Sequence, residues 1–237
     1  MNNFNNLDIK IVKEIKGTLI MLNYKEKSRN YYNCKRTEML KYLPDSAQKI
    51  LDVGCAEASF GALIKEKNNA EVWGIELNSE IAECAKEKID KVLVGDISEK
   101  ITELPDNYFD CIFFNDVLEH LYDPYTLLKQ IKYKLNNEGI IICSLPNIRH
   151  CPVLKDLILN KQWKYNEHGV LDFTHIRFFT QKSIIEMFEN LDYSILKIEG
   201  INGHISFKKI ILLDILSLGF FSDAKYPQFA CIIKPKS

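Results

Sequence analysis

The chain has 237 residues, of which 46% are apolar, and its 31 basic and 32 acidic side chains leave a formal net charge of −1. This length and composition can bury one substantial core, and a charge so close to zero gives no overall field that would draw the protein onto nucleic acid. The seven scattered cysteines and the polar N-terminus, which shows no signal peptide, favour a cytoplasmic protein.

Two helices are expected before the first strand. Apolar residues recur at helical spacing over Ile9–Leu22 and again over Tyr31–Leu43, and Pro44 then interrupts the pattern. We assign both helices to an N-terminal segment, residues 1–46.

Strand and helix patterns alternate through residues 47–145. Short apolar runs predict strands at Lys49–Val53, Glu71–Ile75, Lys91–Val94, Cys111–Phe114 and Ile140–Leu145. Helical patterns begin near Phe60 and cover Ser79–Lys88 and Pro124–Leu135. Such alternation indicates an α/β fold in which helices cover both faces of a parallel sheet.

The regular alternation stops after Pro146. Residues 147–179 are rich in His, Trp, Tyr, Arg and Phe, and a long irregular insertion at the carboxyl end of a strand is usually functional. We therefore expect residues 146–180 to build a substrate pocket. Residues 181–237 then complete the sheet, with a helix capped by Thr180 and strands at Tyr193–Ile198 and Phe229–Ile233.

The strongest apolar segment is Ile210–Phe221. It is shorter than the roughly 20 residues of a membrane span, so we expect no transmembrane segment. The segment is expected to pack on the sheet or on a second subunit of a homo-oligomer, and shallow membrane contact is the alternative.

The turn after the first strand carries an acid where a dinucleotide-binding turn would meet a pyrophosphate. Its sequence runs Asp52-Val-Gly-Cys-Ala-Glu-Ala58. A carboxylate there repels a pyrophosphate but attracts the ammonium group of S-adenosylmethionine (SAM). Glu76, at the tip of the next strand, can accept hydrogen bonds from both ribose hydroxyls. The pattern therefore favours SAM over a dinucleotide.

Four motifs together resemble class I SAM-dependent methyltransferases, in the branch of ubiquinone-biosynthesis O-methyltransferases and sugar or polysaccharide methyltransferases. The motifs are Asp52–Gly61, Gly74–Asn78, Val94–Ile97 and Phe109–Leu121. The resemblance implies a single domain over residues 1–237 with a Rossmann-like, doubly wound sheet of seven strands, the last antiparallel. It also implies SAM as the cofactor and S-adenosylhomocysteine as the product.

The resemblance assigns a part of SAM to each motif. The residues expected to contact it are Asp52, Gly54, Ala56 and Asn115 at the methionine end, Glu76 at the ribose, and Leu77, Asp96 and Ile97 at the adenine. Family members usually carry Gly at the positions of Ala56 and Ala58, where the chain passes close to the ligand and can require positive φ. A catalytically inactive scaffold with the methyltransferase fold is therefore the alternative to an enzyme.

A metal site is one hypothesis for the fourth motif. Asp116, Glu119 and His120 fall within one helical turn, and some relatives hold Mg²⁺ with such a cluster. Many metal-independent relatives carry the same Leu-Glu-His-Leu run. We therefore expect no metal, and we expect His120 to contact the acceptor.

His175 is the expected catalytic base. It lies in Gly169–Thr180, which resembles a segment of methyltransferases from polysaccharide and glycosylation loci. Asp172 would orient its imidazole, and Arg177 would hold a phosphate or carboxylate of a nucleotide-linked sugar. The competing hypothesis is that the three side chains form a structural network. The expected reaction is methyl transfer to a hydroxyl of a small-molecule acceptor, a sugar or glycan precursor, and N-methylation of an amino sugar is the alternative.

Overall fold

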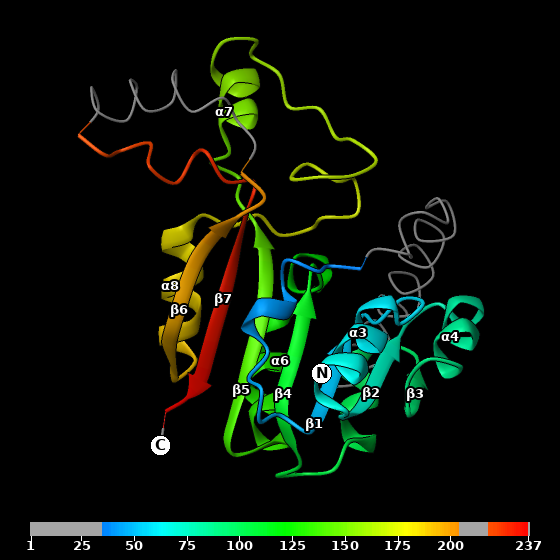
Figure 1. The fold of residues 1–237 in the computed structure, drawn as a ribbon. Coiled ribbons are helices and arrows are strands. Elements are labelled where there is room, and N and C mark those ends of the chain that lie inside the picture. The colour runs from blue at the N-terminus through cyan, green and yellow to red at the C-terminus, as the bar shows by residue number, and fades with distance from the viewer. Residues whose placement is uncertain (1–34, 204–217, 237) are drawn as a thin grey trace, which may run out of the picture.

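A computed structural model describes residues 35–203 and 218–236 of the chain. Its centre is a seven-stranded sheet in the order β3-β2-β1-β4-β5-β7-β6 (Figure 1). The strands are β1 Lys49–Val53, β2 Glu71–Glu76, β3 Lys91–Val94, β4 Phe109–Asn115, β5 Leu135–Pro146, β6 Tyr193–Ile201 and β7 Gln228–Pro235.

Strands β1 to β5 pair in parallel, whereas β7 pairs antiparallel with both of its neighbours, β5 and β6. The predicted Rossmann-like sheet with an antiparallel last strand is confirmed. The strand order changes direction between β1 and β4. At such a point the connecting helices lead away to opposite sides, and α/β sheets bind ligands beyond the carboxyl ends of the strands there.

Helices cover both faces of the sheet. They are α3 Ser59–Asn68, α4 Ser79–Lys86, α5 Ile97–Lys100, α6 Pro124–Ile131, α7 Cys151–Ile158 and α8 Gln181–Asn190, with 3-10 turns η1 Leu40–Tyr42, η2 Ile101–Glu103, η3 Leu118–His120 and η4 Lys132–Lys134. Within the described ranges, none of these helices is long and apolar enough to cross a bilayer.

Alternate strand residues enter two separate cores, because successive side chains of a strand point to opposite faces. Leu51 and Ile112 pack into the core that holds residues of α6 and α8. Ile50 and Phe113 pack into the other core, which holds Phe60 of α3. Each side chain named here is at most 4% exposed, so the central strands are covered on both sides.

The N-terminal segment differs from the sequence prediction where the structure describes it. The predicted helix Ile9–Leu22 and the first part of Tyr31–Leu43 lie outside the described residues, as does most of Ile210–Phe221. From Lys35 onward, only the 3-10 turn η1 forms where an α-helix was expected. Leu43 is already extended, with ψ 121°, because a following proline disfavours the α conformation.

The insertion after β5 contains one helix that the sequence analysis did not predict, α7. Figure 1 shows α7 and the loop after it beyond the carboxyl ends of β4 and β5. The two ends of the insertion meet in an isolated bridge between Asn147 and Phe179. The buried Asn147 amide also donates to the carbonyl oxygens of Asp223 and Tyr226, each at 3.0 Å. The insertion is therefore anchored at the carboxyl end of β5, close to the start of β7.

Candidate active site

A cavity of about 580 Å³ lies at the carboxyl ends of β1, β2 and β4. All eight residues expected to contact SAM line it, namely Asp52, Gly54, Ala56, Glu76, Leu77, Asp96, Ile97 and Asn115. His120, Asp172 and His175 line the same cavity. The structure thus brings the expected cofactor residues to one site with His120, Asp172 and His175.

The turn after β1 has a left-handed backbone at alternate residues. The φ angles are 72° at Gly54, 50° at Ala56 and 54° at Ala58. At Gly54 an added Cβ would lie 2.8 Å from Cγ2 of Val117, so that position requires glycine. Ala56 and Ala58 hold the same conformation despite their side chains, at a cost of roughly 1 kcal/mol or more each. The backbone of the turn therefore has the left-handed conformation that glycine favours, and the two alanines adopt it under strain.

Glu76 is fixed at the tip of β2 by backbone amides. Its Oε2 accepts from the Ala56 N–H at 2.9 Å and its Oε1 accepts from the Asn78 N–H at 2.8 Å. Burial raises the pKa of this carboxyl, and these amide donors act in the opposite direction. Glu76 therefore joins the turn after β1 to the tip of β2, with its carboxyl at the cavity wall.

Asp52 is the most perturbed acid of the cofactor end. It is 3% exposed, and burial together with the nearby Glu76 raises its pKa to about 7. A carboxyl with this pKa is partly protonated at neutral pH and ionises fully when a cation approaches it.

Asp96 and Asn115 differ in how they are bonded. Asp96 caps α5, because its Oδ1 accepts from the Ser98 N–H at 2.7 Å. Neither amide atom of the buried Asn115 side chain has a hydrogen-bond partner within the described part of the protein. Asp96 therefore has a structural task as well as a place in the cavity wall, and Asn115 offers a donor and an acceptor to a ligand.

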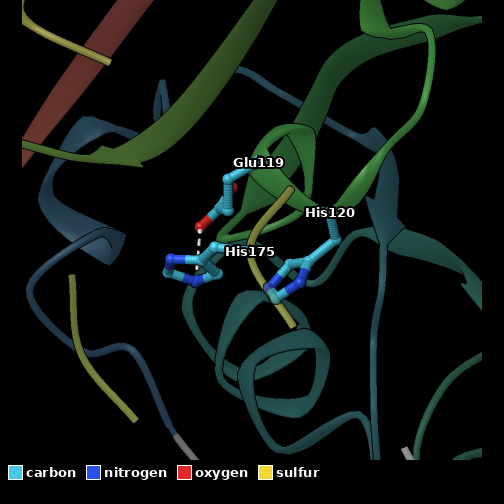
Figure 2. A group of neighbouring side chains, drawn as sticks. All are labelled: Glu119, His120 and His175. Carbon is cyan, nitrogen blue, oxygen red and sulfur yellow. Dashed lines mark ion pairs between the residues drawn. The ribbon is translucent and has the colours of Figure 1, made fainter. Parts of the chain in front are cut away.

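Two histidines and a carboxylate lie side by side in the same cavity (Figure 2). The ring centroids of His120 and His175 are 4.7 Å apart, and Nε2 of His175 lies 3.8 Å from Oε1 of Glu119. Nδ1 of His120 is 3.1 Å from the Thr174 carbonyl, and Nδ1 of His175 is 3.0 Å from the Val170 carbonyl. A carbonyl only accepts, so each ring donates a proton from Nδ1, and a neutral ring then keeps its lone pair on Nε2.

Burial sets the charge of this cluster. It lowers the pKa of His120 to about 4, with a further contribution from His175, so that imidazole is neutral at physiological pH. Burial also raises the pKa of Glu119 well above its usual range, reinforced by Asp116. Glu119 is fully buried, and neither carboxyl oxygen has a hydrogen-bond partner among the residues described.

Asp172 shapes the loop that carries His175. Its Oδ1 accepts from the amide and the hydroxyl of Thr174, at 2.9 and 2.7 Å, and it is 2% exposed. The carbonyl of Thr174 in turn holds His120, whereas Nδ1 of His175 is held by the carbonyl of Val170. Asp172 thereby contributes to the positions of both rings through the backbone between them.

Arg177 is not among the residues that line the cavity. Its guanidinium donates to the carbonyl of Leu121 at 3.2 Å and to the carbonyl of Tyr122, and it stacks over Tyr125. The expected role of Arg177, holding a charged group of the acceptor, stays a prediction. Its planar donors fasten the insertion to the segment after η3.

A family described as "Methyltransferase domain" matches residues 24–198 of the chain. The chain belongs to this methyltransferase family. An uncharacterized methyltransferase of Schizosaccharomyces pombe is 29% identical over 150 residues, which cover 56% of this chain and 54% of that protein. The chain spans about half the length of the curated relatives it matches.

Solved structures share the fold of this methyltransferase. A SAM-dependent methyltransferase from Archaeoglobus fulgidus has a TM-score of 0.64 at 22% identity, covering 87% of this chain and 94% of that chain. Phosphoethanolamine N-methyltransferase 2 of Haemonchus contortus, in complex with SAM, has a TM-score of 0.58 at 16% identity. The match covers 89% of this chain and 53% of that chain. These likenesses show that the chain has the fold of SAM-dependent methyltransferases.

The residues of this methyltransferase fit SAM chemically. Asp52 would offer an acid to the ammonium group and Glu76 one to the ribose, and the two buried amide atoms of Asn115 have no hydrogen-bond partner among the described residues. Leu77 and Ile97 add apolar surface to the wall. An acid-lined cavity of this kind suits a cationic sulfonium nucleoside and not a pyrophosphate.

The methyltransferase site also contains a polar residue that the sequence analysis assigned no role, Gln228, which contacts Asp116. Oδ1 of Asp116 accepts from the hydroxyl of Ser144 and from the amide of Gln228, each at 2.8 Å, and Oδ2 accepts from Arg36. Gln228 enters from β7, 112 residues away in the sequence. No local spacing could have shown this contact. Only the folded sheet brings the start of β7, across β5, within reach of the residue that follows β4.

Proposed function

We propose that this protein transfers a methyl group from SAM to a hydroxyl of a small molecule, a sugar or glycan precursor. The observation that carries the proposal is the presence of two histidines, each with Nδ1 held by a backbone carbonyl, in the same cavity as the acids Asp52 and Glu76. A hydroxyl acceptor must lose a proton during methylation, and an imidazole is the usual group to take it.

The chain's own residues have separate tasks in this reaction. SAM, when bound, supplies an electrophilic methyl group on a sulfonium centre. Asp52 balances the ammonium charge, and Glu76 accepts from the ribose hydroxyls. Nε2 of His175 takes the proton of the acceptor hydroxyl, and Oε1 of Glu119 lies 3.8 Å from that nitrogen.

The insertion positions the acceptor. It contributes His168, Gly169, Val170, Asp172 and His175 to the cavity wall. Methyl transfer is an in-line displacement, so the rate depends on holding the acceptor oxygen close to the methyl group and away from bulk water. The choice of a sugar as acceptor rests on the resemblance of residues 169–180 to segments of glycan-modifying methyltransferases.

Calorimetry with SAM tests the cofactor part of the proposal. The wild-type protein should bind SAM in the micromolar range, and Glu76→Ala should remove the measured heat. Glu80→Ala is the matched control, because Glu80 is an exposed carboxylate of the neighbouring helix α4 and should leave SAM binding unchanged. A wild-type protein without binding heat would favour the inactive scaffold instead.

Transfer of the labelled methyl group tests the acceptor. The protein should be incubated with nucleotide-linked sugars, amino sugars and phenolic acceptors in parallel. We expect a methyl ether on a sugar hydroxyl. Label found only on the nitrogen of an amino sugar would replace the hydroxyl proposal with N-methylation. Label found only on phenols would contradict the proposal that the acceptor is a sugar.

A further inference from the structure

Large apolar side chains are exposed on α7 and on the loop that follows it. Within nine residues, five such side chains are between 40% and 70% exposed, namely Leu157, Ile158, Leu159, Trp163 and Tyr165. Single exposed apolar residues are common on protein surfaces, but a group of them marks a contact with another molecule or with a membrane.

The apolar face of α7 is covered at one end only. Val153 and Leu157 share this face, because residues four apart in a helix lie one above the other. Val153 is buried in a small apolar cluster with Val170 and Leu171. Leu157, one turn further along the helix, is exposed and does not belong to that cluster. The first turn therefore fixes α7 to the insertion, while the apolar side chains of its last turn remain exposed.

The loop after α7 folds back beside these exposed side chains. The Gln162 N–H donates to the carbonyl of Asp156 in α7 at 3.0 Å. The rings of Trp163 and Tyr165 both contact Phe178, which packs against the same small cluster. The last turn of α7 and the loop therefore form one surface, which we call the α7 patch. It consists of Lys155, Leu157, Ile158, Leu159, Lys161, Trp163, Lys164 and Tyr165.

The α7 patch is positively charged. Lys155, Lys161 and Lys164 are exposed, and Asp156 is the only acid in the sequence from 155 to 165. Three lysines and one acid give this stretch a net charge of +2, whereas the whole chain has a net charge of −1. Lysines that alternate with exposed leucine and aromatic side chains are typical of segments that lie in the interface of a membrane with anionic lipids.

We propose that the α7 patch binds to the surface of a membrane that contains anionic lipids. The aliphatic side chains would enter the boundary between headgroups and acyl chains, and the lysines would contact the lipid phosphates. Trp163 and Tyr165 suit the headgroup level, because each has an apolar ring and a polar atom. A second copy of the chain suits the patch less well. In a twofold dimer the patch would face its own copy, which brings the lysines of both copies together.

The α7 patch continues into the wall of the cavity. His168 and Gly169, which follow Tyr165 by three and four residues, line the cavity. Val170 belongs both to the cavity wall and to the cluster that anchors α7. In Figure 1, α7 and its loop lie beyond the carboxyl ends of the strands, the side of the sheet on which the cavity lies. Membrane binding would therefore bring the candidate active site to the lipid surface, and this inference does not rest on the proposed function.

Vesicle binding tests the proposal with the full chain, in the absence of SAM. The protein should bind vesicles of equimolar phosphatidylcholine and phosphatidylglycerol at least ~10-fold more tightly than vesicles of phosphatidylcholine alone, since each lysine at an anionic surface contributes roughly 5-fold. Salt at about 0.5 M should weaken this binding, because it screens the charges of the lysines and of the lipids.

The emission of Trp163 reports whether the α7 patch itself contacts the lipid. The chain has two tryptophans, so Trp73→Phe leaves Trp163 as the only one. When this variant binds the anionic vesicles, we expect the emission to shift to shorter wavelength. We also expect lipids with bromine on their acyl chains to quench it.

Two double variants remove the two parts of the α7 patch separately. Ile158→Ser/Leu159→Ser should weaken binding to the anionic vesicles at least ~10-fold, because less apolar surface leaves water. Lys161→Gln/Lys164→Gln should weaken it by ~10-fold or more at low salt. All four side chains are exposed, so both variants should fold, and circular dichroism checks this.

Matched controls remove the same residue types elsewhere. Leu196→Ser replaces an exposed leucine of β6, and Lys129→Gln replaces an exposed lysine of α6. Neither residue belongs to the α7 patch, so both variants should bind the vesicles as the wild type does.

The proposal fails if the wild type binds anionic vesicles no better than neutral ones, or if the Trp163 emission does not change on binding. It also fails if the folded Ile158→Ser/Leu159→Ser variant binds as the wild type does. A wild-type dimer that this variant converts to monomers, as measured by light scattering, would assign the α7 patch to a second copy instead.

SAM calorimetry without vesicles separates these outcomes from the proposed function. Normal SAM heat without vesicle binding would contradict membrane binding only. Vesicle binding without SAM heat would contradict the proposed function and leave membrane binding in place.

Discussion

Asp52 should make SAM binding depend on pH. Burial and Glu76 raise its pKa to about 7 in the protein without cofactor, and the ammonium group of SAM requires the ionised form. Below that pKa a proton must leave before SAM binds, so affinity should fall up to ~10-fold for each pH unit. Calorimetry between about pH 5.5 and 7.5, below the range in which free α-amino groups lose their proton, measures this slope.

Asp52→Asn provides the control for the pH dependence. The variant should bind SAM more weakly, with an affinity that no longer changes over the same pH range.

Asp52→Asn should also change how the free energy of unfolding depends on pH. A carboxyl whose folded-state pKa is raised stabilises the protein fully below about pH 4, and this contribution is lost as the pH rises through about 7. Asp52→Asn should therefore raise the unfolding free energy at pH 8 and not at pH 4, and the opposite order would contradict the burial argument.

His175→Gln should separate binding from chemistry. Glutamine removes the basic nitrogen while leaving Asp52 and Glu76 in place. We expect SAM affinity to stay unchanged and turnover to fall by roughly 10² or more. His150→Gln is the matched control, because His150 precedes α7 and is not among the residues that line the cavity. Equal rates for wild type and His175→Gln would assign this side chain to structure.

Ala56 and Ala58 test the strain in the turn. Both have positive φ, so glycine should relieve roughly 1 kcal/mol at each position, offset in part by the freedom that glycine adds to the unfolded chain. Ala58 is 0% exposed, and loss of its methyl group costs a further ~0.8 kcal/mol. Urea unfolding should show Ala56→Gly as modestly stabilising and Ala58→Gly as neutral or slightly destabilising. Destabilisation by Ala56→Gly would show that the alanine conformation is not strained.

The cofactor residues could be found from the sequence because each of them lies within a few residues of a strand end. Asp52 and Glu76 follow directly from the apolar runs of β1 and β2, and the parallel arrangement brings both strand ends to one edge. The bonding state of each residue could not be found in that way. That Asp96 caps α5, while the Asn115 amide has no hydrogen-bond partner within residues 35–203 and 218–236, depends on atoms that only the fold brings together.

At the scale of elements, the insertion depends on Asp172. Asp172→Ala removes the acceptor for the amide and hydroxyl of Thr174 and should cost ~1–3 kcal/mol of stability. Turnover should fall because both histidines lose support, while SAM affinity stays the same. Hydrogen exchange of residues 166–175 should increase in the variant. Asp172→Asn keeps the accepting oxygen, so it should retain more protection, and equal effects of the two variants would contradict this account.

Strand positions were predictable where burial leaves a continuous apolar run. β1 has the predicted limits, but β5 begins at Leu135 and not at Ile140. Its first residues include the polar Asn136, Asn137 and Glu138, which hide the strand from any apolar pattern. The short helices α5 and α7 were missed for a related reason. Each starts from a local feature, the Asp96 cap and a proline in the first turn, and not from a long periodic face.

At the scale of the whole molecule, the acceptor half of the site is assembled from distant parts of the chain. Glu119 meets His175 across 56 positions, and Asp116 meets Gln228 across 112. A contact of this kind has no signature in local spacing, because the path of the insertion over the sheet creates it. The sequence therefore pointed to His175 and Arg177, but it did not show that His175 lies beside Glu119 or that Arg177 donates to the carbonyl of Leu121.

The place of β7 between β5 and β6 has a consequence for biosynthesis. During translation, β6 leaves the ribosome before the strand that joins it to the rest of the sheet. Until residues 228–235 emerge, the edge of β5 that later pairs with β7 has unpaired backbone hydrogen-bonding groups, and Asp116 lacks the hydrogen bond from Gln228. Chaperones that shield nascent sheet edges should therefore engage this protein late, after most of its chain has already been made.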